Sequence, residues 1–155
     1  MSRGNLAKEY FESGYNCCQA VALAFKDLVD IDEKALLKLA SSFGGGFGRL
    51  REVCGAFSGM CVIAGLTVGY EKDDGENKME HYKFVRELAE DFKNKNGGSV
   101  VCRELIKGTE KLSSENPSVR TEEYKSKRPC YEIVKNAVEI LELRLSEKGV
   151  KLPNV

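Results

Sequence analysis

Hydrophobic residues recur along this 155-residue chain at the three- and four-residue spacing of amphipathic helices, and strand-like alternation is nearly absent. The spacing predicts helices over residues 6–13, 17–29, 54–69, 100–107 and 129–147. Two more are expected, one between Asp32 and the glycine run at 44–48, the other ending before Asn96. Because short loops join antiparallel helices, the pattern predicts an all-α fold, an irregular bundle of about six or seven helices.

The length and hydrophobic content fit one folded unit. A chain of 155 residues with 42% hydrophobic residues can bury a core of its own. We therefore expect a single helical domain over residues 1–148 and a C-terminal tail over 149–155. Residues 108–127 are polar, contain Pro117 and are expected to form a connector that can include one helical turn.

The predicted helix at 54–69 has four glycines, Gly55, Gly59, Gly65 and Gly69. Each glycine inside a helix costs about 1 kcal/mol relative to alanine. Glycines four residues apart give one smooth face, which lets a neighbouring helix approach closely. Close packing or access to a nearby site is expected to offset their cost.

The six cysteines are the most informative polar feature, because four of them fall where helices are expected to begin. Asn16 and Gln19 have the spacing of a capping box, which makes Cys17 the first residue of its helix. Cys130 follows Pro129, and proline is favoured at the first helical position.

The other two helix-start cysteines follow turn signals. Cys54 comes after the glycine run at 44–48, and Cys102 lies three residues after Ser99, a candidate N-cap. Alternate helices of an antiparallel bundle begin at the same end, so we expect Cys17, Cys54 and Cys102 to converge. The connector before Cys130 is long enough to bring this cysteine to the same end.

A helix N-terminus and nearby cations stabilise a thiolate. Arg49 and Arg51 precede Cys54 and are expected either to lower the pKa of its thiol or to contact an anion. We therefore expect Cys54 to be the most reactive thiol, with Cys17 or Cys102 as its resolving partner. The glycine run itself is typical of a helix stop and a tight turn.

The remaining cysteines and the single histidine are expected to be structural. Cys18 is adjacent to Cys17 and points about 100° away from it around the helix. Cys61 lies seven residues after Cys54, two turns deeper in the predicted core. His81, on a polar helix, is expected at the surface.

Charge and hydropathy exclude several classes of function. The formal net charge is zero, and no basic run with interleaved aromatic residues occurs, so no nucleic-acid partner is expected. The most apolar stretch, 54–70, is too short and too rich in Gly and Ser for a transmembrane span, so no membrane partner is expected. With no signal peptide recognised, we expect a cytoplasmic protein, in which permanent disulfides are rare. A homo-oligomer is compatible with the sequence.

The sequence resembles the C_GCAxxG_C_C family of redox-active proteins over roughly residues 6–143. The resemblance rests on single cysteines at 102 and 130 and on three segments, Ser13–Val21, Phe43–Arg49 and Glu52–Gly59. Where the family name spells Gly-Cys-Ala, this chain has Cys54, Gly55 and Ala56 in the order Cys-Gly-Ala. The match implies that Cys17, Cys54, Cys102 and Cys130 are the motif cysteines, and that the fold is mostly helical.

Haem is not expected, although the split-Soret cytochromes, which are relatives of this fold, carry it. The chain has no Cys-x-x-Cys-His attachment site, and His81 is its only histidine.

Three functions are consistent with the residues. The first is thiol-based redox chemistry with an unidentified partner, as dithiol–disulfide cycling or electron transfer, which would make the protein a thiol-dependent oxidoreductase. The second is zinc or an iron–sulfur cluster held by the four motif cysteines. The third is a non-catalytic helical interaction module. The first is the principal prediction.

Overall fold

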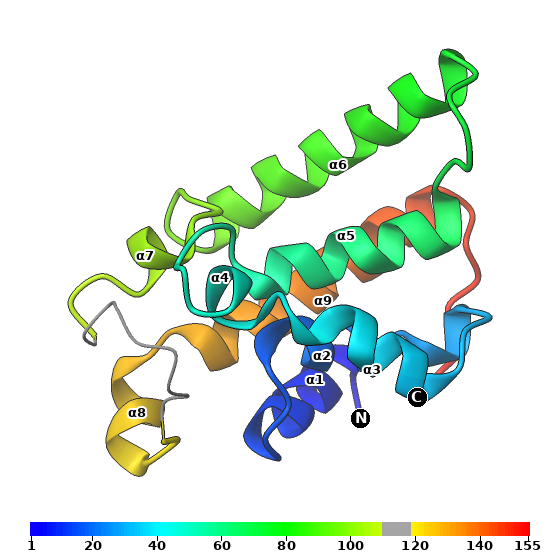
Figure 1. Cartoon of the computed structure of the whole chain (residues 1–155). Coiled ribbons are helices and arrows are strands. Elements are labelled where there is room, and N and C mark those ends of the chain that lie inside the picture. The colour runs from blue at the N-terminus through cyan, green and yellow to red at the C-terminus, as the bar shows by residue number, and fades with distance from the viewer. Residues whose placement is uncertain (110–118) are drawn as a thin grey trace.

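A computed structural model describes residues 1–109 and 119–155 of the chain, and these residues confirm the all-α prediction (Figure 1). The α-helices are α1 (Arg3–Glu12), α2 (Cys17–Leu23), α3 (Glu33–Ser41), α4 (Gly44–Phe47), α5 (Gly55–Val68), α6 (Glu76–Lys95), α7 (Cys102–Leu105), α8 (Glu122–Lys127) and α9 (Cys130–Glu147). A short 3-10 helix, η1, covers Lys26–Leu28. No helix in the described part is long and apolar enough to span a bilayer.

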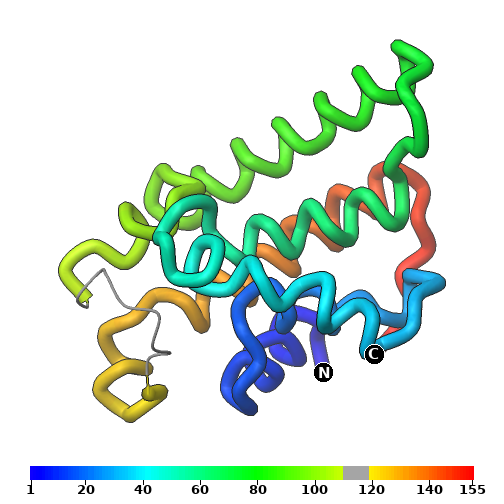
Figure 2. Tube along the Cα trace, in the orientation of Figure 1, coloured from blue at the N-terminus to red at the C-terminus, as the bar shows by residue number. Residues whose placement is uncertain are grey.

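Helices α5 and α9 form the centre of the molecule, with α1, α2 and α3 on one side and α6 on the other (Figure 1). The chain trace in Figure 2 shows that α5 and α9 both begin near α4, α7 and α8. Aliphatic and aromatic side chains from α1, α2, α5, α6 and α9 make one continuous core. This arrangement brings several helix starts to one end of the molecule.

Two glycines of α5 allow its close approach to α2. A Cβ atom at Gly55 would lie 2.3 Å from the Cys17 Sγ, and one at Gly59 would lie 2.8 Å from the Val21 Cβ. A Cβ at Gly65 would meet no atom within 4 Å. The expected smooth helix face is therefore used in the first half of α5 only.

Helix α2 ends at Leu23, earlier than the predicted end at residue 29. The backbone carbonyl of Ala24 accepts a hydrogen bond of 2.7 Å from the Arg3 guanidinium. This side chain comes from another helix and takes an acceptor that a longer α2 would use for its own ladder. The chain continues instead through η1.

Arg3 is a buried cation that joins both ends of the chain. Its guanidinium is 2% exposed, binds the Asp27 carboxylate through two hydrogen bonds of 2.6 Å, and lies 3.5 Å from the Glu142 carboxylate. It also donates a hydrogen bond of 2.8 Å to the backbone carbonyl of Pro153. Residues 149–155 are thus held against the N-terminal helix.

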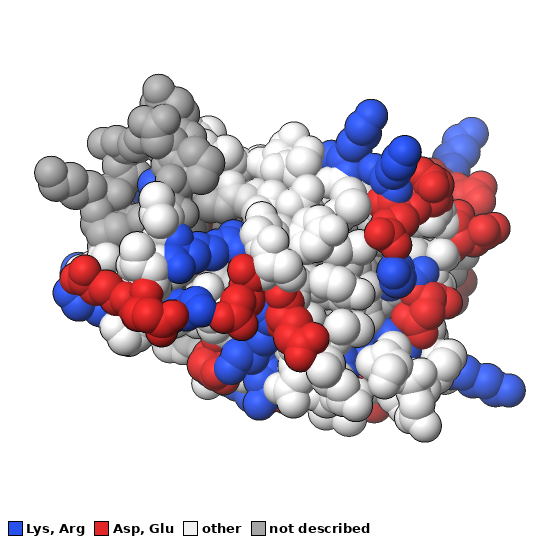
Figure 3. Space-filling view, turned by 90° about the horizontal axis from the view of Figure 1, so that it is seen from below, with Lys and Arg blue, Asp and Glu red and all other residues white. Residues whose placement is uncertain are grey.

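The connector between α7 and α9 contains the short helix α8, where the sequence predicts one helical turn. Pro117 lies outside the described residues. On the face shown in Figure 3, Lys and Arg side chains are interspersed with Asp and Glu side chains around a stretch of uncharged surface. Positive and negative side chains are thus mixed on this face.

Candidate functional site

All four motif cysteines lie at helix starts, as the sequence predicts. Cys17, Cys102 and Cys130 are the first residues of α2, α7 and α9, and Cys54 is the N-cap of α5. The capping box is present at Asn16, whose side chain accepts from the backbone N–H of Gln19. Two other caps differ from the prediction, since Val101 rather than Ser99 caps α7, and Pro129 occupies the N-cap rather than the first position of α9.

A single β-bridge between Val53 and Val101 joins the starts of α5 and α7. The backbone N–H of Cys54 donates to the Val100 carbonyl at 2.7 Å, and that of Cys102 donates to the Glu52 carbonyl at 2.6 Å. Two cysteines far apart in sequence are thereby fixed by main-chain hydrogen bonds, which sequence spacing does not reveal.

The four helix starts surround a cavity of about 290 Å³. Each motif cysteine lines this thiol cavity, and so do residues of the glycine run and four arginines, Arg49, Arg51, Arg120 and Arg128. Cys54 and Cys102 are 8% and 7% exposed, whereas Cys17 and Cys130 are half-buried. The predicted convergence of Cys17, Cys54 and Cys102 is confirmed, and Cys130 joins them.

The glycine run forms a left-handed loop at the mouth of this cavity. Gly45, Gly46 and Gly48 have positive φ, and so do three larger residues, Phe47, Arg49 and Arg51, at 63°, 67° and 61°. A Cβ at Gly46 would lie 2.7 Å from the Glu52 backbone nitrogen and 2.9 Å from the Cys102 Cβ. Positive φ is unfavourable for residues with a Cβ, so the loop is held by its surroundings.

The loop presents Arg51 to Cys102. The Arg51 Nη1 lies 3.7 Å from the Cys102 Sγ, and this guanidinium is 4% exposed. On the opposite wall the Arg128 Nη1 lies 3.9 Å from the Cys130 Sγ and 3.4 Å from the Tyr124 hydroxyl. Contact of Arg49 or Arg51 with the Cys54 thiolate, or with an anion, stays a prediction.

The prediction of a low pKa for the Cys54 thiol is wrong. Burial raises the pKa of the Cys54 thiol well above its usual value, and the neighbouring Cys17 thiol raises it further. The backbone N–H groups of Phe57 and Ala56, at the start of α5, oppose this shift but are the smaller effect. Loss of solvation outweighs the helix terminus at this position.

Burial likewise raises the pKa of the Cys17 and Cys130 thiols to about 11. Three groups oppose the shift at Cys130, namely the Tyr124 hydroxyl, which hydrogen-bonds its sulfur, and the charges of Arg51 and Arg120. Since Cys130 is also half-buried, it is the cavity thiol with the strongest combination of access and positive charge around it.

The three residues predicted to be structural lie outside the lining of the cavity. Cys18 is completely buried in the core, and Cys61 is half-buried and packs against the core. Burial raises the pKa of the Cys61 thiol to about 11, with no charged group opposing it. His81 is half-buried rather than fully exposed, and its ring lies against Tyr70 and Phe84.

Three further residues of the cavity escaped the sequence interpretation, namely Arg120, Tyr124 and Arg128. Arg128 and Tyr124 precede Cys130 by two and six residues, so proximity to a motif cysteine is the signal that could have found them. Arg120 is near no motif cysteine in sequence.

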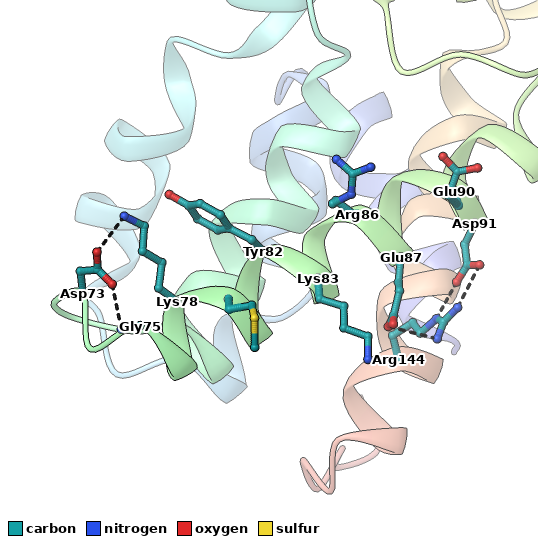
Figure 4. A pocket seen from close by; sticks show the side chains of 11 residues that line it. Asp73, Gly75, Lys78, Tyr82, Lys83, Arg86, Glu87, Glu90, Asp91 and Arg144 are labelled. Atoms are coloured by element: carbon teal, nitrogen blue, oxygen red, sulfur yellow. Dashed lines mark hydrogen bonds and ion pairs between the residues drawn. The ribbon is translucent and has the colours of Figure 1, made fainter.

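A second, more open hollow runs along α6 (Figure 4). Two ion pairs lie within it: Arg144 binds the Asp91 carboxylate at 2.6 Å, and Lys78 lies 3.3 Å from the Asp73 carboxylate. No cysteine lines it. The thiol cavity is therefore the candidate site.

All six cysteines are free thiols. Within the described residues, no group of three or more His, Cys, Asp or Glu side chains is placed to hold a metal ion. The described structure thus gives no support to zinc or an iron–sulfur cluster on Cys17, Cys54, Cys102 and Cys130, which stays a prediction. The metal content of protein purified without chelator would test it.

Comparison with known protein families matches residues 15–143 to the family described as "Putative redox-active protein (C_GCAxxG_C_C)". The chain belongs to this family. The match includes all four cysteines of the thiol cavity and the glycine loop. No curated protein and no solved structure matches the chain. Family membership thus supports redox activity and leaves its mechanism to be argued from the cavity.

Proposed function

We propose that this protein is a thiol–disulfide redox protein in which the thiol cavity cycles between dithiol and disulfide. The observation that carries the proposal is the convergence of four thiols, from four separate helix starts, on one cavity with arginines in its wall. Thiols used only as core filling, such as Cys18, need neither a cavity nor nearby cations.

The reaction begins at Cys130. The residue is half-buried, and the charges of Arg51 and Arg120 favour formation of its thiolate against the burial that raises the pKa of this thiol to about 11. The Cys130 thiolate attacks a disulfide of the partner, which forms a mixed disulfide and releases one partner thiolate. A second cavity thiolate then attacks the Cys130 sulfur, so that the cavity disulfide forms and the partner leaves as a dithiol. Two electrons have passed from the cavity to the partner.

Cys102 is the best candidate for the second thiol. It lines the same cavity as Cys130, and among the cysteines it has the largest electrostatic effect on the pKa of Cys130. The Arg51 guanidinium beside the Cys102 sulfur would stabilise its thiolate during the second step. Cys17 also interacts with Cys130 and is the alternative.

Redox titration with peptide mapping tests this proposal. Equilibration with glutathione buffers should produce an internal disulfide that contains Cys130, identified by mass spectrometry of the unreduced digest. Cys130→Ser should abolish this disulfide, whereas Cys61→Ser, a matched half-buried thiol outside the cavity lining, should leave it intact. A disulfide that survives Cys130→Ser, or the absence of any cavity disulfide under oxidising conditions, would overturn the proposal.

A further inference from the structure

The charged side chains that line the described part of the thiol cavity all have the same sign. Arg49, Arg51, Arg120 and Arg128 line it, and none of the described lining residues is Asp or Glu. Burial and the neighbouring Arg51 charge lower the pKa of Arg49, so the first two guanidinium groups repel one another. Positive charge concentrated in a small hollow attracts anions.

Arg120 has a buried hydrogen-bond donor without a partner in the described structure. Its guanidinium stacks on the Phe11 ring at 3.9 Å from the ring centroid, and its Nη2 donates to the Tyr15 backbone carbonyl at 2.9 Å. Its Nη1 is buried and has no hydrogen-bond partner among the described residues. A buried donor without a partner is unfavourable, and a bound acceptor would remove this cost.

The thiols of Cys17 and Cys130 do not supply the acceptor charge at neutral pH. The pKa values of about 11 at Cys17 and Cys130 keep both sulfurs protonated near pH 7. A guanidinium prefers the paired oxygens of a carboxylate, phosphate or sulfate, which it binds through two parallel hydrogen bonds. At about 290 Å³ the cavity is at the lower end of the range for ligand sites, so the ligand is small.

We infer that the thiol cavity binds a small anion with a carboxylate, phosphate or sulfate group, held by Arg120 together with Arg51 and Arg128. The inference deepens the proposed function, because it assigns the anionic class of molecule that reaches the cavity thiols. The phenyl ring of Phe11 and the backbone carbonyl of Tyr15 fix the Arg120 guanidinium in place before the anion arrives.

Calorimetric titration of the reduced protein with sodium sulfate, sodium phosphate and sodium malonate tests the inference. Sodium chloride holds the ionic strength constant, because salt screens exposed charges. At least one of the three anions should bind, and the comparison shows whether a tetrahedral or a carboxylate group is preferred. If none of the three binds more tightly than chloride, the inference is wrong.

Arg120→Gln should weaken the best anion about tenfold or more, the loss expected for one charged hydrogen-bond donor. Arg86→Gln is the matched control, because Arg86 is exposed on α6 and lines only the open hollow. Equal weakening in both variants would overturn the inference. In case Arg120→Gln fails to fold, alkylation of the parent protein gives an independent readout: the anion should slow modification of Cys130 and leave that of Cys61 unchanged, and equal rates with and without the anion would contradict the site.

The anion site and the redox cycle can fail separately. A Cys102→Ser/Cys130→Ser variant should lose the disulfide but keep the anion affinity, because the arginines remain. An anion that binds the parent, together with no cavity disulfide on oxidation, would leave the anion site standing and overturn the redox proposal. A cavity disulfide with no anion binding would support the redox proposal and overturn the anion site.

Discussion

At Cys54 two effects on a thiol oppose one another. The N-terminal turn of α5 supplies N–H groups that favour the thiolate, whereas burial removes the water that would solvate it. At Cys54 burial is the larger effect and raises the pKa of the thiol. At Cys17 burial likewise raises the pKa more than the N–H groups of Gly45 and Cys18 lower it. The sequence shows where a helix begins, but burial depends on which distant segments cover that helix. A helix start therefore predicts the place of a thiol better than its pKa.

These raised pKa values have a consequence for stability at high pH. An unfolded cysteine ionises near pH 9, whereas Cys17 and Cys130 keep their protons in the folded protein until about pH 11. Since the folded state binds the protons more tightly, each thiol stabilises it below pH 9 and loses this contribution as the pH rises through 11. The free energy of unfolding should fall by on the order of 2 kcal/mol per thiol.

Urea unfolding of the reduced protein between pH 8 and 11 measures this loss. The Cys17→Ser/Cys130→Ser variant should lose less stability over this interval than the parent, because serine does not ionise there. Surface lysines affect both proteins equally and cancel in the comparison. Parallel pH dependences in the two proteins would show that these thiols are not protonated more tightly on folding.

At the scale of elements, most predicted helix boundaries lie close to the observed ones, and the end of α2 is the exception. The starts depend on neighbours in sequence, such as Asn16 with Gln19, and these local hydrogen bonds form wherever the helix lies. The end of α2 depends on Arg3, which takes the Ala24 carbonyl from another helix. A continuous apolar pattern through residue 29 gives no sign of such a competitor.

Two glycines of α5 should respond in opposite ways to substitution. Gly59→Ala places a Cβ 2.8 Å from the Val21 Cβ and 2.9 Å from the Cys18 carbonyl oxygen, so it should destabilise the protein by about 1–3 kcal/mol. Gly65→Ala meets open space and should stabilise it by about 0.5–1 kcal/mol. Chemical denaturation of both variants decides the matter; equal effects would mean that α5 and α2 are not in close contact at Gly59.

At the scale of the whole molecule, the sequence predicts the convergence of cysteines but misses most of the charge around them. Alternation of antiparallel helices is a property of the bundle as a whole, so it can be read from the order of elements. The place of Arg120 depends on how the connector folds back over Phe11, and no local pattern encodes that path. A cavity is a relation between distant segments, so its lining is the last feature that sequence reveals.

The buried Arg3 network holds the two ends of the chain together, and its loss should be costly. Arg3→Ala leaves the Asp27 carboxylate and the Ala24 and Pro153 carbonyls without their donor, so the free energy of unfolding should fall by about 3 kcal/mol or more. Lys8→Ala, which removes a surface ion pair to Glu132, should cost less than about 1 kcal/mol. Similar losses for the two variants in urea would contradict a structural role for Arg3.

The gathering of four thiols from distant helix starts also has a consequence for the newborn protein. A ribosome makes the chain from its N-terminus, and Cys17 emerges long before Cys130. Until α9 is complete, one wall of the thiol cavity is missing. The earlier cysteines are then exposed to solvent and lack the burial that raises the pKa values of Cys17 and Cys54 in the folded protein. The chemistry of this site is therefore complete only after α9 has packed against the other helix starts.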